Sequence, residues 1–515
     1  MAGLKLLLDT NIVIALEDPR TVPPGMAALV QKAQLHGLTL FLDDACIADI
    51  ERDPNLERRE ATLSKLRKFP ALPGVAHRSE SEMVARFGDV RSPNDRCDVL
   101  MLDTLDLNVV DFLVSEDIGL HKRAERATLR DRVFTVREAL AWIQRAFEPR
   151  DFRLPYVVSR KAYQIPASDP IFDSLREGYP DFDRWWSEKC VAQHRDCWVV
   201  EIDGQLAGLV VYKLETHADA KTRHRGPRIL KVCTFKMKPE FRGEKFGEQL
   251  LKTILWYAQG NGYDLVYLTA HADQEFLITL LQTFGFEVTQ TQSNGELVIE
   301  KPMVANEHPV ALGSSVIETA MRAYPRFYEG DGVGKYAIPI LPAFHRVLFP
   351  EIAEAVPLPL FPGDQFVAGS TVESDRTPGN TVRKVYVCRS PTRTLNPGDL
   401  LLFYLSKSEE LVRSQTVTTI GVIEQVQHAT STAQLVRLVG RRSVYTREDL
   451  EAWHASEDRP VLVIDFLLNG HLQPPVTLAT LLACGAFTNR PPQSIKSLTE
   501  ESYRAIRSST QVHYE

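Results

Sequence analysis

The sequence Lys238-Pro239-Glu240-Phe241-Arg242-Gly243-Glu244-Lys245-Phe246-Gly247 joins an apolar run to an amphipathic one. The apolar run, 229–237, predicts a β-strand that ends before Pro239, and residues 246–259 predict an α-helix. Glycines ahead of a helix leave backbone N–H groups open, and the helix dipole adds positive potential at the same place. The segment therefore predicts a pyrophosphate site at the start of this helix.

The pattern of strands and helices extends on both sides of this segment. Further strands are expected at 197–202, 206–214 and 265–269, and a second helix at 273–284 that leads into Phe284-Gly285-Phe286. These features together resemble the GNAT family of N-acetyltransferases over residues 160–303. The resemblance implies an α/β fold with a mixed sheet and acetyl-CoA as the cofactor, with the pantetheine arm paired to the backbone near Met237. It implies as cofactor-binding residues Met237, Arg242, Gly243, Lys245, Phe246 and Gly247.

Two positions depart from the pattern of that family. Lys245 stands where the family has a central glycine, and Leu281 stands where many members have the tyrosine that protonates the leaving thiolate. The strand 229–237 also carries no obvious carboxylate base. Weak acetylation, another acid/base pair such as His271 or Asp273, and a substrate that needs little base are the alternatives. An α-amine, which is partly neutral at about pH 8, is then a better acceptor than a lysine. A domain that serves only as a scaffold is the remaining alternative.

The densest basic stretch of the chain lies at 221–245, where Glu240 and Glu244 are the only acids. Such a stretch fits the 3′-phosphate of CoA or an RNA acceptor, with Arg225 as a candidate RNA contact. A solvated loop over 216–228 explains it equally well.

Residues 1–147 alternate short apolar runs with charged amphipathic stretches, which is typical of an α/β fold. Leu6-Leu7-Leu8-Asp9-Thr10-Asn11 predicts a buried strand followed by an acid, and Val110-Asp111-Phe112-Leu113-Val114-Ser115-Glu116-Asp117 repeats that design. Parallel strands bring their carboxyl ends to one edge of a sheet, so Asp9 and Asp117 are expected side by side. Asp49 and Asp98 come from helical runs between them. Four carboxylates repel one another unless a hard cation such as Mg²⁺ or Mn²⁺ compensates their charge.

This order of acids resembles the PIN domain, a metal-dependent ribonuclease fold, over residues 1–147. The resemblance implies that Asp9, Asp49, Asp98 and Asp117 are the catalytic, metal-binding acids, and that Thr10 and Asn11 support them. The metal would activate water for attack on a phosphodiester. The second acid is commonly Glu in this family, so Glu51 is an alternative to Asp49. Helix capping is the structural alternative for each acid that follows a strand.

The C-terminal part, 365–515, holds short β-rich runs, and residues 304–364, rich in Pro and Gly, are expected to connect it to the preceding domain. A turn at Asn396-Pro397-Gly398-Asp399 leads into an apolar strand at 400–405. Together with Gly421-Val422-Ile423-Glu424 it resembles the PUA-like (ASCH/EVE-type) β-barrels, which commonly bind RNA. The resemblance implies RNA contacts from Tyr404, Arg441 and Arg442. Core packing of the tyrosine and surface positions for the arginines are the alternative.

The composition of the 515 residues excludes several classes of protein. A net charge of −7 excludes a uniformly basic nucleic-acid-binding protein. Seven cysteines without a CxxC pair argue against a disulfide framework and against a zinc ribbon. No apolar run approaches the roughly 18–20 residues of a membrane span. A cytoplasmic protein without membrane contact is expected.

The sequence thus predicts a multidomain chain: a PIN-like nuclease domain (1–147), a GNAT domain (160–303), a connecting segment (304–364) and a PUA-like domain (365–515). The arrangement resembles bacterial toxin-type fusion proteins of toxin–antitoxin or phage-defence systems. The main hypothesis is an RNA-targeting effector that cleaves RNA, most simply tRNA, with an antitoxin or a second copy of the chain as further partners. The alternatives are an acetyl-CoA-dependent N-acetyltransferase for aminoacyl-tRNA or protein with an inert PIN-like module, and a non-enzymatic RNA-binding regulator.

Overall fold

The computed structural model describes residues 4–9, 12, 25–44, 47, 59–60, 69–72, 74–148, 157–202, 204–238, 241, 246–303, 315–330, 332–352, 382–408, 411, 413–440 and 445–514. The chain divides into two compact units: a first unit of residues 1–150 with 429–461, and a second unit of residues 151–428 with 462–515. None of the helices in these ranges combines the length and the apolar character that spanning a bilayer requires.

The first unit is built on a four-stranded sheet with the order β2-β1-β3-β4, in which the paired strands are parallel. Leu6, Leu7 and Leu8 on the inner strand β1 are fully buried, as expected for a parallel sheet covered on both faces. The strands are β1 (Lys5–Leu8), β2 (Thr39–Leu42), β3 (Phe112–Val114) and β4 (Val133–Phe134). The helices are α2 (Met26–Leu35), α5 (Glu80–Phe87), α6 (Pro93–Asp106), α7 (Ile118–Arg126) and α8 (Val136–Phe147).

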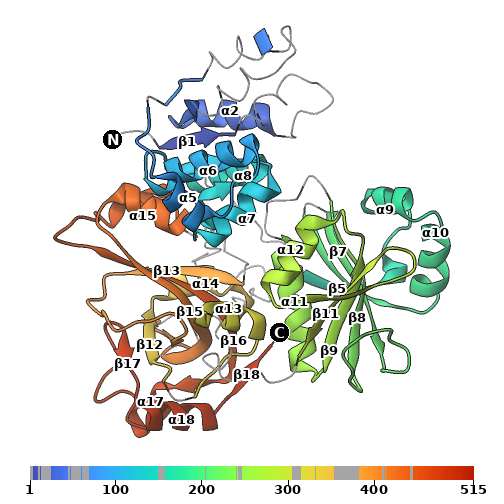
Figure 1. Cartoon of the computed structure of the whole chain (residues 1–515). Coiled ribbons are helices and arrows are strands. Elements are labelled where there is room, and N and C mark those ends of the chain that lie inside the picture. The colour runs from blue at the N-terminus through green and yellow to red at the C-terminus, as the bar shows by residue number, and fades with distance from the viewer. Residues whose placement is uncertain are drawn as a thin grey trace, which may run out of the picture. The chain divides into compact units, whose positions relative to one another are not determined.

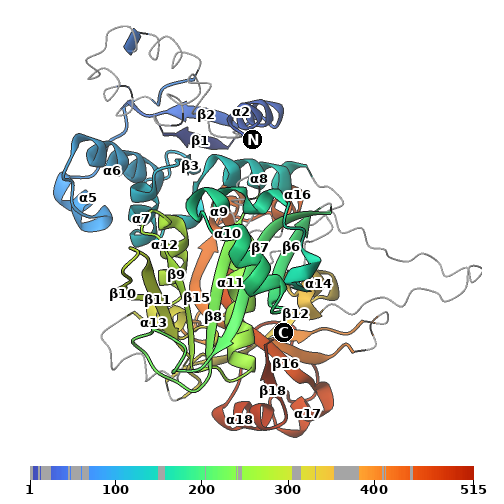
Figure 2. The ribbon, with the colours of Figure 1, turned by 90° about the vertical axis from the view of Figure 1, so that its right-hand side faces the viewer.

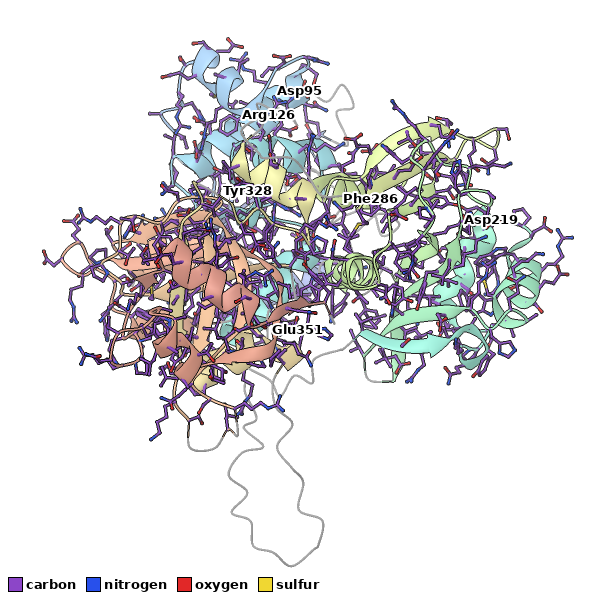
Figure 3. All side chains as sticks on the ribbon, turned by 90° about the horizontal axis from the view of Figure 1, so that it is seen from below. Asp95, Arg126, Asp219, Phe286, Tyr328 and Glu351 are labelled. Carbon is purple, nitrogen blue, oxygen red and sulfur yellow. The ribbon has the colours of Figure 1, made fainter. Side chains whose placement is uncertain are left out.

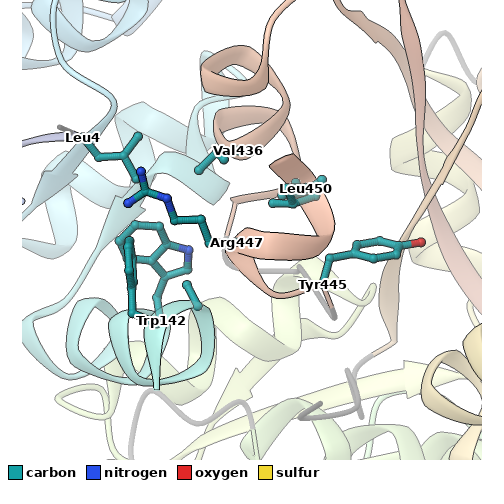
Figure 4. A pocket seen from close by; sticks show the side chains of 9 residues that line it. Leu4, Trp142, Val436, Tyr445, Arg447 and Leu450 are labelled. Atoms are coloured by element: carbon teal, nitrogen blue, oxygen red, sulfur yellow. The ribbon is translucent and has the colours of Figure 1, made fainter. Parts of the chain in front are cut away.

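Residues 429–461 complete this first unit although they lie far from it in the sequence. They form α15 (Thr432–Val439) and α16 (Arg447–Ala452). Arg437 forms an ion pair of 3.0 Å with Asp111, and the Arg447 guanidinium lies 5.3 Å from the centre of the Phe147 ring. A small apolar pocket separates the two helices from α8, with Trp142 on its wall (Figure 4). The segment therefore packs on the N-terminal sheet domain.

The second unit contains a seven-stranded sheet with the order β10-β11-β9-β8-β7-β6-β5. Its strands are β5 (Val157–Lys161), β6 (Asp196–Ile202), β7 (Gln205–Glu215), β8 (Ile229–Met237), β9 (Leu265–Ala270), β10 (Glu287–Thr291) and β11 (Leu297–Pro302). Neighbouring strands are antiparallel except β8 and β9, which are parallel because the helix α11 (Phe246–Gly260) crosses over between them.

Helices cover both faces of this sheet (Figure 1). On one face, Tyr257 of α11 packs against Trp198 and Tyr212, with ring centroids 5.1 and 5.4 Å away. On the other face, α9 (Asp173–Gly178), α10 (Phe182–Trp185) and the π-helical turn Trp186–Val191 cover the alternate residues Cys197 and Val199. The helix α12 (Glu275–Thr283) follows β9. This alternation of inward-facing residues is the period-2 pattern that the sequence predicts.

A second seven-stranded sheet follows, with the order β13-β16-β15-β14-β12-β17, and β18 pairs with β16. Its strands are β12 (Lys335–Ile340), β13 (Arg383–Cys388), β14 (Leu400–Leu405), β15 (Thr416–Ala429), β16 (Val461–Thr477), β17 (Lys496–Ser497) and β18 (Gln511–His513). The helices are α13 (Val316–Ala323), α14 (Pro342–Leu348), α17 (Leu478–Ala483) and α18 (Glu500–Ser508), and Figure 2 shows α17 and α18 beside β18.

This sheet begins earlier in the chain than residue 365. The strand β12, within the expected connecting segment, pairs in parallel with β14 from Lys335–Leu400 to Ile340–Leu405. All six residues of β14 are buried, and its two edges pair with β15 and β12, so the sheet includes residues before 365. The described pairings form a path with two ends, β13 and β17, and closure into a barrel stays a prediction.

Candidate functional site

The parallel strands β8 and β9 pair over only part of their length. Their register runs from Ile229–Leu265 to Val232–Leu268, whereas β8 continues to Met237 with β7 as its partner. Alternate residues of the stretch 233–237 therefore direct their backbone N–H and C=O groups toward the β9 side, where the described part of the chain places no paired strand. An extended ligand can bind such a half-open strand as a further strand would.

The helix α11 begins next to this open end. As the crossover from β8 to β9, it starts at the carboxyl end of β8, and its first-turn residue Gly247 follows the buried Phe246. A Cβ at Gly247 would meet only Leu280 at an ordinary 3.7 Å, so packing within the protein does not require a glycine there. A glycine at a helix start also permits a close approach of a ligand to the backbone. Three predicted cofactor-binding residues, Arg242, Gly243 and Lys245, lie outside the described residues.

The helix α11 is fixed firmly within the second unit. Leu250, Leu251 and Leu255 have no exposed surface. The Trp256 indole N–H of this helix donates a hydrogen bond of 2.6 Å to the hydroxyl of Tyr324, which follows α13. A ligand at the N-terminus of α11 would therefore meet a preorganised group of N–H donors.

At the carboxyl end of β9 a histidine faces a carboxylate. The antiparallel pair Ala270–Leu297 is the last of the β9–β11 ladder, which places His271 and Glu296 opposite each other. The Nε2 atom of His271 lies 4.0 Å from Oε1 of Glu296, and the Tyr179 hydroxyl donates a hydrogen bond of 2.9 Å to the same oxygen. Burial together with the Glu296 carboxylate raises the pKa of Tyr179 above its usual range. His271 is among the residues that the sequence predicts, whereas Tyr179 and Glu296 are not. The Asn294-Gly295 hairpin signal next to Glu296 is the one local clue to that carboxylate.

Two further positions that the sequence singles out, Leu281 and Met237, have clear structural roles. Leu281, on α12, is 1% exposed and belongs to the core, so this position supplies no proton to a leaving group. Met237 ends β8 opposite Gly208, where a Cβ would come within 2.6 Å of the methionine sulfur. The end of β8 is therefore tightly packed on its β7 side and open on its β9 side.

The basic loop ahead of β8 is organised by a buried acid. Glu300, with no exposed surface, accepts hydrogen bonds from the backbone N–H groups of Arg223 and His224 at 2.8 and 2.9 Å. Arg225 is exposed in this loop. The loop precedes Ile229, so the length of β8, about 30 Å for nine residues, separates it from the open end near Met237. This distance argues against the 3′-phosphate of CoA as the ligand of the basic loop. RNA contact and a solvated loop remain as the two alternatives.

In the first unit, three of the four predicted acids lie near one another. Ser115 links two of them, because its hydroxyl donates a 2.5 Å hydrogen bond to Asp9 and accepts one of 3.0 Å from the Asp117 backbone N–H. Burial, Asp117 and Asp9 together raise the pKa of Asp98 to about 7. Asp117 also caps α7 through the Leu120 N–H at 2.8 Å, which is the structural alternative from the sequence.

The fit of these acids to a metal ion is incomplete. Across the ranges that the structure describes, no group of three or more His, Cys, Asp or Glu side chains is arranged to hold a metal ion. Asp49, Thr10 and Asn11 lie outside those ranges. Next to the cluster, Asp95 (labelled in Figure 3) forms an ion pair of 3.2 Å with Arg123, so a cationic partner is present.

The prediction of base stacking by Tyr404 is wrong for the described structure. Tyr404 is 1% exposed, and its ring packs edge-on against Phe487 with centroids 5.3 Å apart. The alternation of β14 points this side chain into the apolar core, where it has no surface to offer a base. Arg441 and Arg442 lie outside the described residues.

Comparison with known proteins identifies one part of the chain. Residues 160–286 match the model of the acetyltransferase (GNAT) family. No curated protein matches the chain in sequence. The structure is similar to ASCH from Zymomonas mobilis, at 13% identity and a TM-score of 0.25, over 35% of this chain and 97% of that one. It is also similar to the PaiA N-acetyltransferase from Thermoplasma acidophilum in complex with coenzyme A, at 16% identity and a TM-score of 0.23, over 28% of this chain and 99% of that one.

A third similar structure is the ribosomal-protein-S18-alanine N-acetyltransferase from Escherichia coli, at 13% identity and a TM-score of 0.24, over 30% of this chain and 98% of that one. The family match covers β6 to β9 with the half-open strand pair and the crossover helix α11. Residues 160–286 of this chain are an acetyltransferase domain of the GNAT family.

Proposed function

We propose that this chain is an acetyl-CoA-dependent N-acetyltransferase whose cofactor lies at the open end between β8 and β9. One observation carries the proposal: pairing with β9 ends at Val232–Leu268, while β8 continues to Met237 and α11 begins just beyond it. From the sequence, this function is the alternative, and RNA cleavage is the main hypothesis.

The residues present fit this cofactor. Acetyl-CoA supplies an acetyl group activated as a thioester. The open backbone groups of residues 233–237 bind the extended pantetheine arm and exclude water from one of its edges. The N–H groups of the first turn of α11, around Gly247, bind the pyrophosphate. Leu281 is buried, so the proton for the departing sulfur comes from another group or from solvent.

Calorimetric titration with CoA tests this site. Gly247→Glu places a side chain and a negative charge where the pyrophosphate is expected, and we expect CoA affinity to fall at least tenfold. Gly260→Glu is the matched control, because it makes the same change at the other end of the same helix, about 20 Å away. Unchanged affinity in Gly247→Glu, or equal losses in both variants, would remove the assignment.

RNA cleavage by the first unit is a second candidate function. The specific observation in its favour is the convergence of Asp9, Asp98 and Asp117: burial, Asp117 and Asp9 together raise the pKa of Asp98 to about 7. Burying like charges costs stability, and functional sites are where such arrangements are most often found. The described acids do not form a metal site on their own.

Incubation of the full chain with total tRNA and Mn²⁺, with and without EDTA, tests this candidate on a denaturing gel. Discrete EDTA-sensitive fragments that disappear in Asp98→Asn would support it. Asp89→Asn, at an aspartate whose side chain is 71% exposed, is the control. Intact tRNA with the unaltered chain would contradict the candidate.

A further inference from the structure

The carboxyl ends of β9 and β8 point in the same direction, because the two strands are parallel. His271 follows the last residue of β9, three residues beyond the end of the β8–β9 pairing at Leu268. It therefore lies beside the open stretch 233–237 of β8, where the proposed cofactor would present its thioester. Its side chain is 39% exposed, so an incoming acceptor can reach it.

The partner of His271 is held rigidly. Glu296 has a side chain that is 11% exposed, and its two oxygens are each fixed by a donor. The Tyr179 hydroxyl donates to Oε1 at 2.9 Å, and the Asn294 side-chain amide donates to Oε2 at 3.0 Å. A carboxylate fixed in this way can orient a neighbouring imidazole.

Tyr179 joins two parts of the domain that are far apart in sequence. It follows α9 on one side, and Glu296 ends the turn between β10 and β11 on the other. The Tyr179 and His271 rings are 5.5 Å apart at an angle of 35°. The three side chains thus form one cluster at the mouth of the open strand pair.

We propose that His271, oriented by Glu296 and with Tyr179 as a positioning residue, is the general base that removes a proton from a primary α-amine during acetyl transfer. The inference rests on the proposed function and names its acceptor class and its base. The sequence of β8 contains no obvious carboxylate to act as the base. This cluster supplies a base from the residues that follow β9 and precede β11.

The chemistry balances without a further reactant. The neutral amine nitrogen attacks the acetyl carbonyl carbon, the C–N bond forms and the C–S bond breaks. The imidazole of His271 takes one amine proton and passes it to solvent, and the departing sulfur takes one proton from solvent. The products are the N-acetyl amine and the free thiol of CoA.

The charge of the cluster favours an amine acceptor. The carboxylates near His271 are Glu296, across the ladder, and Asp273, two residues along the chain, which acts electrostatically on Tyr179. These acids attract an ammonium group into the mouth and repel a carboxylate. An α-amine is more readily deprotonated than a lysine side chain, so one histidine suffices as its base.

Thiol release from acetyl-CoA by the full chain tests the proposal with two acceptors. The first is a mixture of Xaa-Ala-Ala tripeptides with free α-amines, and the second is hydroxylamine, which is largely unprotonated at neutral pH and needs no base. We expect His271→Gln to lower kcat/KM for the tripeptides about 100-fold or more. Its rate with hydroxylamine and its affinity for CoA should stay within twofold of the unaltered chain.

Substitution of the two supporting residues should lower kcat by smaller factors. Glu296→Gln should lower kcat for the tripeptides about tenfold, and Tyr179→Phe should lower kcat about threefold with KM unchanged. The control Glu188→Gln, an exposed position in the same domain, should have no effect.

A tripeptide rate of His271→Gln within threefold of the unaltered chain would overturn the assignment of the base. Transfer to hydroxylamine but to none of the tripeptides would overturn the assignment of the acceptor. An unaltered chain that binds no CoA would overturn the proposed function itself, and this inference with it.

Discussion

Lys252 on α11 forms an ion pair with Glu351, which lies in the segment between β12 and β13 (Figure 3). The exposed fractions of the two side chains are only 7% and 15%. Burial alone would raise the pKa of Glu351, but Lys252, Lys384 and His471 together hold it far below its usual range. This pair joins the acetyltransferase sheet to the second sheet of the same unit.

Removal of this carboxylate should destabilise the second unit strongly. Glu351→Gln leaves Lys252 and Lys384 without their shared counter-charge, and loss of one partner of a buried pair costs about 3–5 kcal/mol. Urea unfolding followed by tryptophan fluorescence measures this loss, because Trp256 lies beside Lys252. The control Glu188→Gln removes an exposed carboxylate and should leave the midpoint unchanged. Equal midpoints for both variants would show that the ion pair contributes nothing.

His345 should make the second unit sensitive to acid. Its ring is 5% exposed, its Nε2 lies 2.8 Å from the Thr418 hydroxyl, and burial lowers its pKa to about 4. A pKa that is lower in the folded state gives stability above about pH 6.5, which is lost as the pH falls toward 4. The loss attributable to this group reaches about 3 kcal/mol.

The measurement is the free energy of unfolding at several pH values between 7 and 4.5 for the unaltered chain and for His345→Gln. The variant should be less stable at pH 7 and should lose less stability on acidification. Parallel pH curves for the two proteins would contradict this role of His345.

The helices at 429–461 should stabilise the N-terminal sheet domain. Val436 is 8% exposed and lines the apolar pocket beside α8. Val436→Asp buries a charge there, and we expect a loss of about 3 kcal/mol or more in the first unit. Ala433→Asp adds the same charge at an exposed position of the same helix and is the control. Limited proteolysis within residues 74–148 provides the readout, and identical cleavage rates for both variants would argue against the contact.

The loop organised by Glu300 should bind RNA through charge. Arg223→Ala with Arg225→Ala removes two exposed cations, and the affinity for a 20-nucleotide single-stranded RNA should fall about tenfold. The slope of log affinity against log salt should shrink by about 1.4. Arg184→Ala with Lys189→Ala, two exposed cations elsewhere in the domain, is the matched control. Equal effects of both pairs, or no RNA binding by the unaltered chain, would leave the loop as a solvated surface.

The local sequence pattern was sufficient to predict strands and helices of the acetyltransferase domain. The expected strand at 229–237 is confirmed over the same residues, and the expected helix at 246–259 is observed as Phe246–Gly260. Alternating apolar residues and the Pro and Gly residues that end each element act within a few positions of each other, so a single sequence contains this information.

The candidate base cluster was only partly predictable. His271 stands next to a predicted strand and is visible as a titratable residue in the sequence. Its partners are not, because Tyr179 and Glu296 are 117 positions apart and meet only when α9 folds against the β10–β11 turn. Tyr404 illustrates the opposite case, since its aromatic ring suggested a surface contact and only the packing of β14 shows that it is a core residue.

The sequence by itself determined the order of the elements, the position of the helix that follows the predicted phosphate-binding loop, and the acids Asp9 and Asp117 that come after β1 and β3. These features depend on neighbouring residues and on strand ends that meet at one edge of a parallel sheet. The tertiary structure alone decided which distant residues come together: the helices at 429–461 with the N-terminal sheet, Lys252 with Glu351, and Glu296 with His271. Such contacts arise from burial and shape complementarity between folded surfaces, which local periodicity in a sequence does not encode.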